Sequence, residues 1–334
     1  MNVLVVKKPG ADSKFVLEEW DMPIPKETEV LVQVKCFGLN RMDIAQRKGT
    51  YPVPLPEKSL IGVEVSGIVQ STGKNVTLFK PGDAVFGLLP AGGGYAEYAV
   101  MEECLTMHKP EKLTFEEASS IPETWFVAYQ ALHLVGEMRK GESVLIHAGA
   151  SGVGVAAIQL AKEAEAQRKY LRYCRIRRES QVLRKHWSYK RIKLQNSQLE
   201  KQELTNDKGV DIIIDFVGRD YWKHNIDSLA VDGRMIILAY LSGPDIENIH
   251  ISDFVIKRIS IRGSNLRDRS LKYQRELRNQ VYNNVVLKHL AREDGKLKVI
   301  VNKVFQWEDI ADAHHYLESN RSTGKIVVRI TSNQ

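Results

Sequence analysis

The sequence has few cysteines and no long apolar run. Its 334 residues include three cysteines, at positions 36, 104 and 174. They are too few and too widely spaced for a disulfide framework or for a zinc site built from paired cysteines. No apolar run reaches the ~20 residues that a membrane span needs, and the N-terminal stretch MNVLVVKKPG lacks the pattern of a signal peptide. We therefore expect reduced thiols, no membrane partner and a cytoplasmic location.

Acidic residues are scarce in one segment, and this explains the net charge of +7. Residues 168–193 contain 11 lysines and arginines but a single acid, Glu179, so this segment carries +10 and the remainder carries −3. Aromatic residues are interleaved with the charges, a pattern that nucleic-acid-binding segments also show. We expect a solvated segment and no nucleic-acid partner, although binding through this segment stays open as an alternative.

The length gives room for two domains of ordinary size. Residues 1–120 consist mostly of short runs rich in β-branched residues, separated by turn signals such as Pro81-Gly82-Asp83. They predict a compact, barrel-like β domain. From residue 144 to residue 290, apolar strands alternate with helical patterns, which predicts a parallel, doubly wound sheet. The tail after residue 297 has β character that fits the first domain better than the second.

The stretch from Val144 to Lys162 runs from a short apolar strand through a glycine turn into an amphipathic helix. Gly149, Gly152 and Gly154 allow a sharp turn and a close approach of the backbone to a pyrophosphate. A helix that begins near Gly152 aims its free N–H groups at such an anion. The pattern therefore favours a dinucleotide site, although the same glycines also occur in ordinary tight turns.

Several motifs in fixed order resemble those of the medium-chain dehydrogenase/reductases, and more narrowly the zinc-free quinone oxidoreductases of the zeta-crystallin type. The matching stretches are LNRMDIAQRKGTYP, GVEVSG, PGDAVFGL, GGGYAEY, AGASGVG, VDIIIDFVG and the terminal GKIVV. The resemblance implies an α/β protein with a GroES-like β-barrel catalytic domain, residues 1–124 and 297–334, and a Rossmann NAD(P)-binding domain, residues 125–296. It also implies an NADPH-dependent quinone reductase that forms a homodimer. Reduction of enones or enoyl thioesters on the same fold stays open as an alternative.

Zinc enzymes that share this fold take a cysteine and a histidine from two motifs near the N-terminus. The corresponding positions here contain Asn40-Arg41-Met42-Asp43 and Gly62-Val63-Glu64, with neither a thiol nor an imidazole. Zinc prefers these two ligands, so we expect no metal. The remaining chemistry is hydride delivery from a reduced nicotinamide to an acceptor that is already electrophilic, such as a quinone or an enone.

The resemblance also implies site residues. Tyr51 and Asn40 are the candidate catalytic residues, placed near the nicotinamide, although each is also compatible with a simple turn. The expected cofactor-binding residues follow the glycine turn, later strand ends and the C-terminal motif, where ligands bind in open α/β sheets. They are Gly149, Ser151, Gly152, Val153, Gly154, Val217, Gly218, Tyr240, Leu241, Asn265, Leu266 and Lys325.

Residues 165–204 depart from the family pattern. No run of four apolar or β-branched residues occurs where the second Rossmann strand belongs, so we expect an internal strand to be missing and the domain to be labile. The length is preserved, which suggests the hypothesis of a compensated reading-frame change. A remnant that no longer binds a cofactor is a further alternative. NADPH is expected because the family uses it, and the arginines at 172 and 175 favour a 2′-phosphate only weakly.

Overall fold

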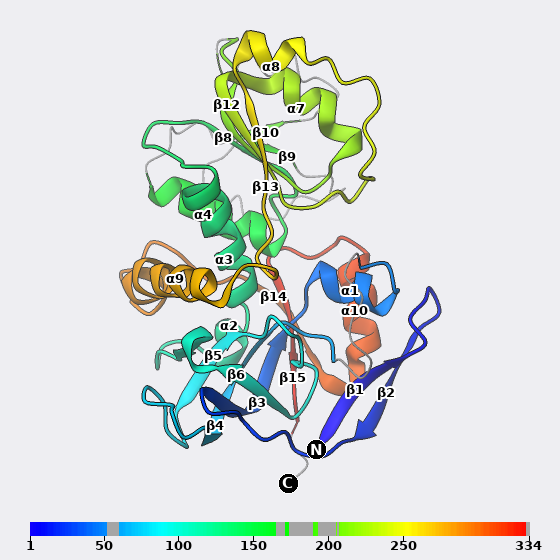
Figure 1. Cartoon of the computed structure of the whole chain (residues 1–334), viewed down its shortest axis with the longest axis vertical. Coiled ribbons are helices and arrows are strands. Elements are labelled where there is room, and N and C mark those ends of the chain that lie inside the picture. The colour runs from blue at the N-terminus through cyan, green and yellow to red at the C-terminus, as the bar shows by residue number, and fades with distance from the viewer. Residues whose placement is uncertain (52–59, 165–170, 174–189, 193–204, 206, 332–334) are drawn as a thin grey trace. The chain divides into compact units, whose positions relative to one another are not determined.

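The computed structural model (Figure 1) describes residues 1–51, 60–164, 171–173, 190–192, 205 and 207–331; of residues 171–173 and 190–192 it describes the backbone alone. Contacts divide the chain into two compact units. The first unit joins Met1–Thr124 to Arg267–Gln334, and the second is Trp125–Leu266. Each unit has its own sheet, as the sequence predicts.

The first unit is built on a seven-stranded sheet in the order β14-β15-β3-β4-β5-β7, with β6 paired to β3. Except for the parallel β14–β15 pair, neighbouring strands run antiparallel. A separate antiparallel pair, β1–β2, forms a hairpin. The strands are β1 Asn2–Lys7, β2 Lys14–Glu19, β3 Glu29–Gly38, β4 Glu64–Thr72, β5 Ala84–Leu88, β6 Tyr98–Glu102, β7 Thr106–His108, β14 Val301–Gln306 and β15 Lys325–Arg329. The C-terminal strand β15 lies beside β3, so the tail belongs to this unit.

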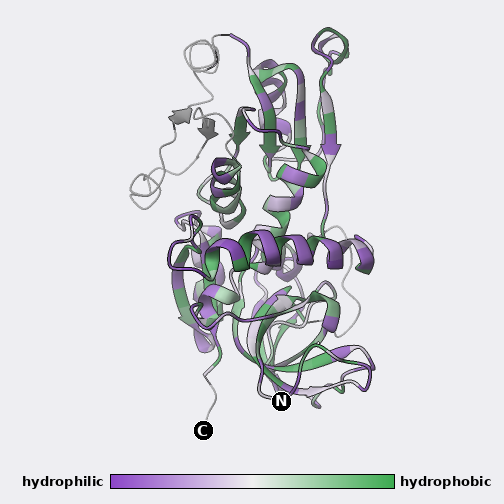
Figure 2. Ribbon diagram, turned by 90° about the vertical axis from the view of Figure 1, so that its left-hand side faces the viewer, coloured by the Kyte–Doolittle hydropathy of each residue, from purple (hydrophilic) through white to green (hydrophobic). Residues whose placement is uncertain are grey.

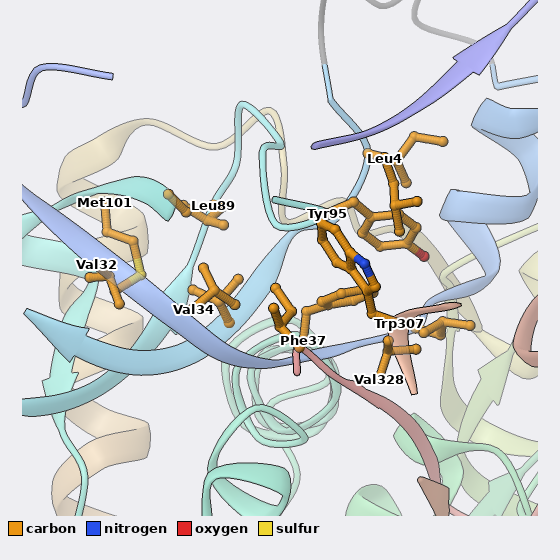
Figure 3. Close-up of a cluster of buried hydrophobic side chains, with 14 of the residues drawn as sticks. Leu4, Val32, Val34, Phe37, Leu89, Tyr95, Met101, Trp307 and Val328 are labelled. Atoms are coloured by element: carbon orange, nitrogen blue, oxygen red, sulfur yellow. The ribbon is translucent and has the colours of Figure 1, made fainter. Parts of the chain in front are cut away.

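The core of the first unit is aromatic at its centre (Figure 3). Phe37 and Tyr95 are fully buried, and their ring centroids lie 4.4 Å apart. Leu4 and Trp307 belong to the same cluster, so the first strand and the C-terminal region share one core. Burying large aromatic rings supplies much of the apolar stabilisation of such a domain.

The helices of the first unit include one segment that we expected in the second. They are α1 Arg41–Arg47, η1 Glu103–Leu105, α2 Phe115–Ala118, α9 Leu271–Val281, η5 Tyr282–Leu290, η6 Trp307–Asp309 and α10 Ile310–Glu318; α3 Pro122–Tyr129 crosses the boundary between the units. The expected boundary near residue 296 differs from the observed one at Arg267. Arg278 Nε donates to the Cys104 carbonyl at 2.9 Å and the Tyr282 hydroxyl donates to the His108 carbonyl at 3.1 Å, which ties α9 and η5 to the first unit.

The second unit contains a six-stranded parallel sheet in the order β10-β9-β8-β11-β12-β13. The strands are β8 Val144–Ile146, β9 Leu171–Tyr173, β10 Lys190–Ile192, β11 Val210–Asp215, β12 Leu229–Ile237 and β13 Ser260–Gly263. The expectation of a missing internal strand is wrong, because β9 pairs with β8 and β10 pairs with β9. Backbone pairing with a neighbour does not require an apolar run. The rest of 165–204 lies outside the described residues.

Helices accompany the strands of the second unit: η2 Gln130–Val135, α4 Gly152–Glu163, η4 Arg219–Tyr221, α7 Trp222–Ser228 and α8 Ser252–Lys257. In Figure 2 the sheet strands are mostly green, whereas α9 of the first unit is mostly purple. Within the described part of the chain, no helix is long and apolar enough to cross a membrane.

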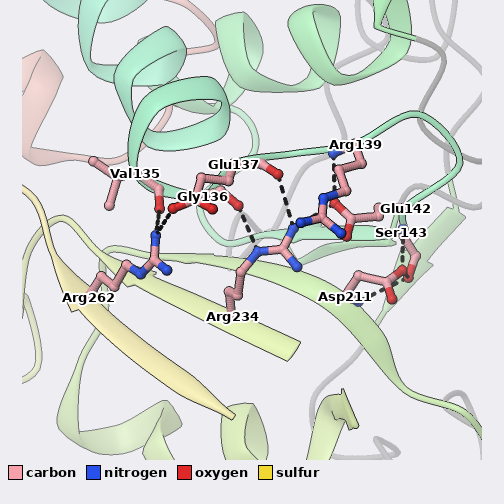
Figure 4. A network of polar contacts seen from close by, with 9 residues as sticks. All are labelled: Val135, Gly136, Glu137, Arg139, Glu142, Ser143, Asp211, Arg234 and Arg262. Carbon is pink, nitrogen blue, oxygen red and sulfur yellow. Dashed lines mark hydrogen bonds and ion pairs between the residues drawn. The ribbon is translucent and has the colours of Figure 1, made fainter. Parts of the chain in front are cut away.

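Arginine side chains close the end of helix η2 (Figure 4). Arg262 donates to the Val135 carbonyl at 2.7 Å, and Arg234 donates to the Gly136 carbonyl at 2.7 Å. Arg234 also pairs with Glu142 at 2.6 Å. The last carbonyls of a helix have no partner within it, so these guanidinium groups satisfy them and attach the helix to β12 and β13.

A hydrogen-bonded chain of three buried polar residues crosses the core of the first unit. The Tyr95 hydroxyl lies 3.2 Å from Asp43 Oδ2 and 2.9 Å from His314 Nε2. Burial raises the pKa of Asp43 to about 7, against the effects of the Asn40 N–H and of Lys325. Burial, aided by Arg47, lowers the pKa of His314 to about 3. His314 is therefore neutral in the folded protein, and its Nε2–H donates to Tyr95 when Tyr95 donates to Asp43.

His314 should make the first unit sensitive to acid. Its pKa is lower in the folded state, so its contribution to stability is complete above the unfolded value near 6.5 and is lost as the pH falls toward 3. At pH 5 the loss should be on the order of 2 kcal/mol. We predict that His314→Gln, measured by chemical denaturation at pH 7.5 and pH 5, loses less stability than the wild type between these values. His315→Gln, at the exposed neighbouring position, serves as the control; an equal loss in all three proteins would contradict the prediction.

Candidate functional site

Four loops that carry expected cofactor residues follow four adjacent strands of the second unit. The strands β8, β11, β12 and β13 are neighbours in the parallel sheet. Parallel strands end at the same edge, so the loops after them lie along one edge of the sheet. This is the edge at which open α/β sheets bind ligands. The structure therefore gathers the predicted residues of the second unit at this edge.

The first of these loops is the glycine turn. The Ser151 N–H donates to the Ala148 carbonyl at 2.8 Å, and Ser151 Oγ caps helix α4 by accepting the Gly154 N–H at 3.1 Å. A Cβ at position 154 would lie 2.5 Å from the Ala148 oxygen and 2.6 Å from Gly149 Cα. Position 154 therefore requires glycine, because any side chain there would clash with the backbone of the turn that precedes helix α4. The turn starts a 12-residue helix, whose first N–H groups and dipole suit an anion such as a pyrophosphate.

The second loop, after β11, is held in place by a buried carboxylate. Asp215 accepts the N–H of Val217 at 2.8 Å and the N–H of Gly218 at 3.1 Å. Gly218 has φ +83°, and a Cβ there would lie 3.0 Å from Tyr240 Cα in the neighbouring loop. Position 218 therefore requires glycine. Tyr240 and Leu241 expose 48% and 65% of their surface, which leaves both side chains available to a ligand.

A buried histidine and asparagine lie beneath the same loops. His147 directly follows β8, and its Nε2 lies 2.6 Å from Asn225 Oδ1 on α7. Burial lowers the pKa of His147 and raises that of Asp215, and the attraction between the two groups opposes both effects. Asn225 acts in the same direction as His147 and lowers the pKa of Asp215. The hydrogen bond between His147 and Asn225 thus joins the loop after β8 to α7.

The fourth loop, after β13, is attached to helix η2. Gln130 is buried, and its Nε2 donates to Ser264 Oγ at 3.0 Å and to the Asn265 carbonyl at 3.3 Å. Asn265 is exposed and Leu266 is buried. The side-chain amide of Gln130 therefore holds the backbone of this loop directly after β13.

In the first unit, the expected residues Asn40 and Lys325 are in direct contact around a buried carboxylate. Lys325 Nζ lies 2.5 Å from Glu64 Oε1 and donates to Asn40 Oδ1 at 2.6 Å. Asn40 Nδ2 in turn donates to Glu64 Oε1 at 2.9 Å. Lys325 is 4% exposed and Glu64 is completely buried. The three groups form a closed cluster that fixes the orientation of the Asn40 amide.

A second carboxyl borders this cluster. The N–H of Glu123, in the first turn of α3, donates to Glu64 Oε2 at 2.8 Å. Burial and the charge of Glu64 raise the pKa of Glu123 to about 7, although Lys325 acts in the opposite direction. The Glu123 residue is partly exposed. A carboxylic acid that holds its proton near neutral pH is a suitable proton donor.

The remaining candidate, Tyr51, contacts an arginine. The guanidinium carbon of Arg267 lies 5.4 Å from the centroid of the Tyr51 ring. Arg267 Nε donates to the Pro90 carbonyl at 2.8 Å, which fixes the guanidinium beside the ring. Within the described ranges, no group of three or more His, Cys, Asp or Glu residues is arranged to hold a metal ion.

Sequence reasoning missed the residues that support the loops and the second carboxyl. Asp215 ends the apolar run VDIIID, and a charge at the end of a buried strand could have drawn attention to it. Glu123 follows Pro122 at the start of a helix, where an acid is commonplace, so its pattern carried no functional signal. Gln130 and Asn225 act through contacts with distant parts of the sequence, which no local pattern reveals.

Two family models match the chain. The model described as "Alcohol dehydrogenase GroES-like domain" matches residues 26–111, and the one described as "Zinc-binding dehydrogenase" matches residues 189–328. The second match includes neither Asn40 nor Glu64, so its description does not bear on a metal at those positions.

Proteins that match the chain over almost its whole length include quinone oxidoreductases and an enoyl reductase. A quinone oxidoreductase from Sus scrofa is 29% identical over 98% of this chain and 96% of its own length. The crystal structure of Escherichia coli quinone oxidoreductase complexed with NADPH has a TM-score of 0.84 at 27% identity, covering 98% of this chain and 99% of that one. The apo form of JamJ enoyl reductase has a TM-score of 0.84 at 26% identity and covers 99% of each chain.

We predict that Lys325 is essential to the stability of the first unit. Lys325→Met leaves the buried Glu64 carboxylate without its cation, which should lower the free energy of unfolding by about 3–5 kcal/mol. Replacing Glu64 as well, in Lys325→Met/Glu64→Gln, should restore most of the loss. Lys7→Met, which breaks an exposed pair with Glu18, is the control and should change little. Chemical denaturation gives the free energy of unfolding of the wild type and the three variants. A Lys325→Met protein as stable as the wild type would refute the stabilising role of Lys325.

Proposed function

Because the chain is an oxidoreductase of the medium-chain dehydrogenase/reductase superfamily, we propose that it transfers hydride from NADPH to a quinone without the help of a metal. The observation that carries most weight is the set of four loops at one edge of the parallel sheet, three of which are held by hydrogen bonds from polar side chains. Relatives named quinone oxidoreductases, one of them complexed with NADPH, support this choice of reaction.

The residues of the second unit fit a dinucleotide. The pyrophosphate would be held by Ser151, Gly152 and Val153, at the N-terminus of α4. Val217, Gly218, Tyr240, Leu241, Asn265 and Leu266 would hold the two nucleoside halves. When bound, the cofactor supplies a hydride at its nicotinamide ring. The chain's part is to fix the loops before binding, so little ordering remains to be done when the ligand arrives.

In the first unit, the cluster around Lys325 supplies a fixed positive charge and a fixed amide. The Lys325 ammonium contacts Glu64 and Asn40, both of which lie in the motifs that would carry zinc ligands in the metal-dependent enzymes. An ammonium in this position repels a divalent cation, which supports a reaction without metal. Tyr51, held beside Arg267, offers an aromatic face and a hydroxyl to a planar acceptor.

Reduction of an enoyl thioester is the second candidate. The likeness to an enoyl reductase structure favours it, because the two proteins match over almost their whole lengths. Both reactions use the same hydride donor, so they differ only in the acceptor.

We propose a homodimer in the cytoplasm without a nucleic-acid partner. Mass measurement in solution tests whether the protein is a homodimer. RNA binding measured at several salt concentrations tests whether the basic segment binds nucleic acid.

The decisive experiment is a titration of the protein with NADPH and NADH, followed by steady-state assays with quinones, enones and enoyl thioesters. We expect tighter binding of NADPH and faster turnover of quinones. A protein that binds neither nucleotide would be a cofactor-less remnant, and the proposal would fail.

We predict that Gly152→Val abolishes NADPH binding. Its side chain would stand at the N-terminus of α4, where the pyrophosphate is expected, and the first unit should stay folded. Gly10→Val is the control, since a Cβ at position 10 meets nothing closer than 4.0 Å. An NADPH affinity equal to that of the wild type in Gly152→Val, measured by fluorescence titration, would disprove the phosphate assignment.

Prolonged dialysis against a chelator should leave reductase activity intact, because Asn40 and Val63 stand where metal ligands would be. Activity and metal content are measured before and after dialysis. Loss of activity that zinc restores, and that magnesium does not, would contradict metal-independent reduction.

A further inference from the structure

Most hydrogen-bond donors of the Arg267 guanidinium have no acceptor in the described part of the chain. Arg267 Nε donates to the Pro90 carbonyl at 2.8 Å, and no other hydrogen bond or ion pair joins Arg267 to the described residues. The N–H groups on Nη1 and Nη2 therefore lack a protein partner. Nη1 is also buried, so it has lost water without gaining an acceptor in return. Such a donor is costly unless a ligand supplies the acceptor.

Arg47 shows how a buried arginine is satisfied elsewhere in the same unit. It is 5% exposed, its Nη2 binds Glu318 at 3.0 Å, and its Nη1 donates to the Ser13 carbonyl at 3.5 Å. Within the described ranges no carboxylate forms such an ion pair with Arg267. Glu123 responds to the charge of Arg267 but forms no ion pair with it. The positive charge of Arg267 is thus left for a ligand to neutralise.

The ring of Tyr51 lies beside this guanidinium. The guanidinium carbon of Arg267 is 5.4 Å from the ring centroid, within the range of a cation–π contact. The bond to Pro90 holds the rigid guanidinium by its Nε, so its terminal N–H groups keep a fixed direction. An aromatic ring next to unused, charged N–H donors suits a planar ligand that carries an oxygen atom. All three residues belong to the first unit.

We propose that Arg267 binds the oxygen atom of the acceptor that becomes negatively charged when hydride is added, an inference that rests on the proposed function. A quinone that accepts a hydride gains two electrons and one hydrogen and becomes a hydroquinone monoanion, while NADPH is oxidised to NADP⁺. An enone becomes an enolate in the same step. In both products the charge resides on oxygen, and water then supplies the proton that completes the hydroquinone or the saturated ketone.

The terminal N–H groups of Arg267 donate to this oxygen. A charged donor binds an oxyanion more strongly than it binds the neutral carbonyl from which the oxyanion forms. Its interaction therefore grows as hydride is transferred, which lowers the barrier to the transfer. Because the donors have no protein acceptor to leave, no hydrogen bond within the chain has to break first. Tyr51 orients the ring of the acceptor so that its oxygen meets these donors.

The first test measures binding and needs no turnover. Para-nitrophenol is a planar phenol whose ionised form is yellow and whose neutral form is colourless, so its absorbance reports which form is bound. With and without NADP⁺, we titrate the wild type and its variants at pH values on both sides of the pKa of the free phenol. The wild type should bind the phenolate at least tenfold more tightly than the neutral phenol, whereas Arg267→Gln should bind the two forms equally.

Arg278→Gln is the matched control. Arg278 is also partly exposed and also donates through Nε to a backbone carbonyl, that of Cys104, at 2.9 Å. This variant should keep the preference for the phenolate. A wild type without that preference under either condition, or a preference that survives in Arg267→Gln, would overturn the assignment whether or not the protein reduces quinones.

The second test is kinetic. In Arg267→Gln the kcat for quinone reduction should fall by about 10²-fold, the lower range for loss of an oxyanion donor, while NADPH affinity stays within two-fold of the wild type. Arg267→Lys keeps the charge and should retain a larger part of kcat. Guanidinium ion, added far below denaturing concentrations, should restore part of the activity of Arg267→Ala and leave that of Arg278→Ala unchanged. A folded Arg267→Gln enzyme with the wild-type kcat, or an Arg267→Ala enzyme that guanidinium does not rescue, would refute the role of Arg267 while leaving quinone reduction established.

Discussion

The first unit depends on the burial of one ammonium group. Lys325 begins the C-terminal strand β15, and its Nζ binds Glu64 at the start of β4 and Asn40 before α1. Buried charges cost several kcal/mol each unless they are paired, so all three residues must be placed together. Gly38 shows how tight this requirement is. A Cβ there would lie 2.5 Å from Glu64 Oε1 and 2.7 Å from Lys325 Cε. The strand can pass the ion pair only because position 38 has no side chain.

The second unit uses neutral or singly charged groups to hold its loops. Asp215 binds two backbone N–H groups, Ser151 caps α4, and Gln130 binds the loop after β13. Each contact satisfies a backbone group that would otherwise need water. Loops fixed in this way lose little conformational freedom when a ligand binds, which favours affinity. These polar side chains therefore fix the loops at this edge of the sheet.

Local patterns in the sequence predicted most of the helices and strands but not the contacts between distant residues. The order of strand, glycine turn and helix after Val144 predicted both the fold of this domain and the start of the helix near Gly152, because such motifs are contiguous. Glu64 and Glu123 are 59 positions apart and Lys325 lies far beyond them, so no window contains their cluster. The strand at Leu171 was missed for a different reason. This strand pairs with β8 through backbone hydrogen bonds. A sequence pattern indicates a strand through its apolar and β-branched side chains, and this strand has few of them.

The site residues belong mostly to one unit or the other. Of the residues expected to bind the dinucleotide, all but Lys325 lie within Trp125–Leu266, whereas the cluster of Lys325, Glu64 and Asn40 lies in the unit that joins Met1–Thr124 to Arg267–Gln334. Each set of contacts is closed within its own unit, with Asp215 and Gln130 in one and Lys325 and Glu64 in the other. Changes at sites without shared partners usually act additively. Substitutions in the loops of the second unit and substitutions in the Lys325 cluster should therefore change the free energy of unfolding additively.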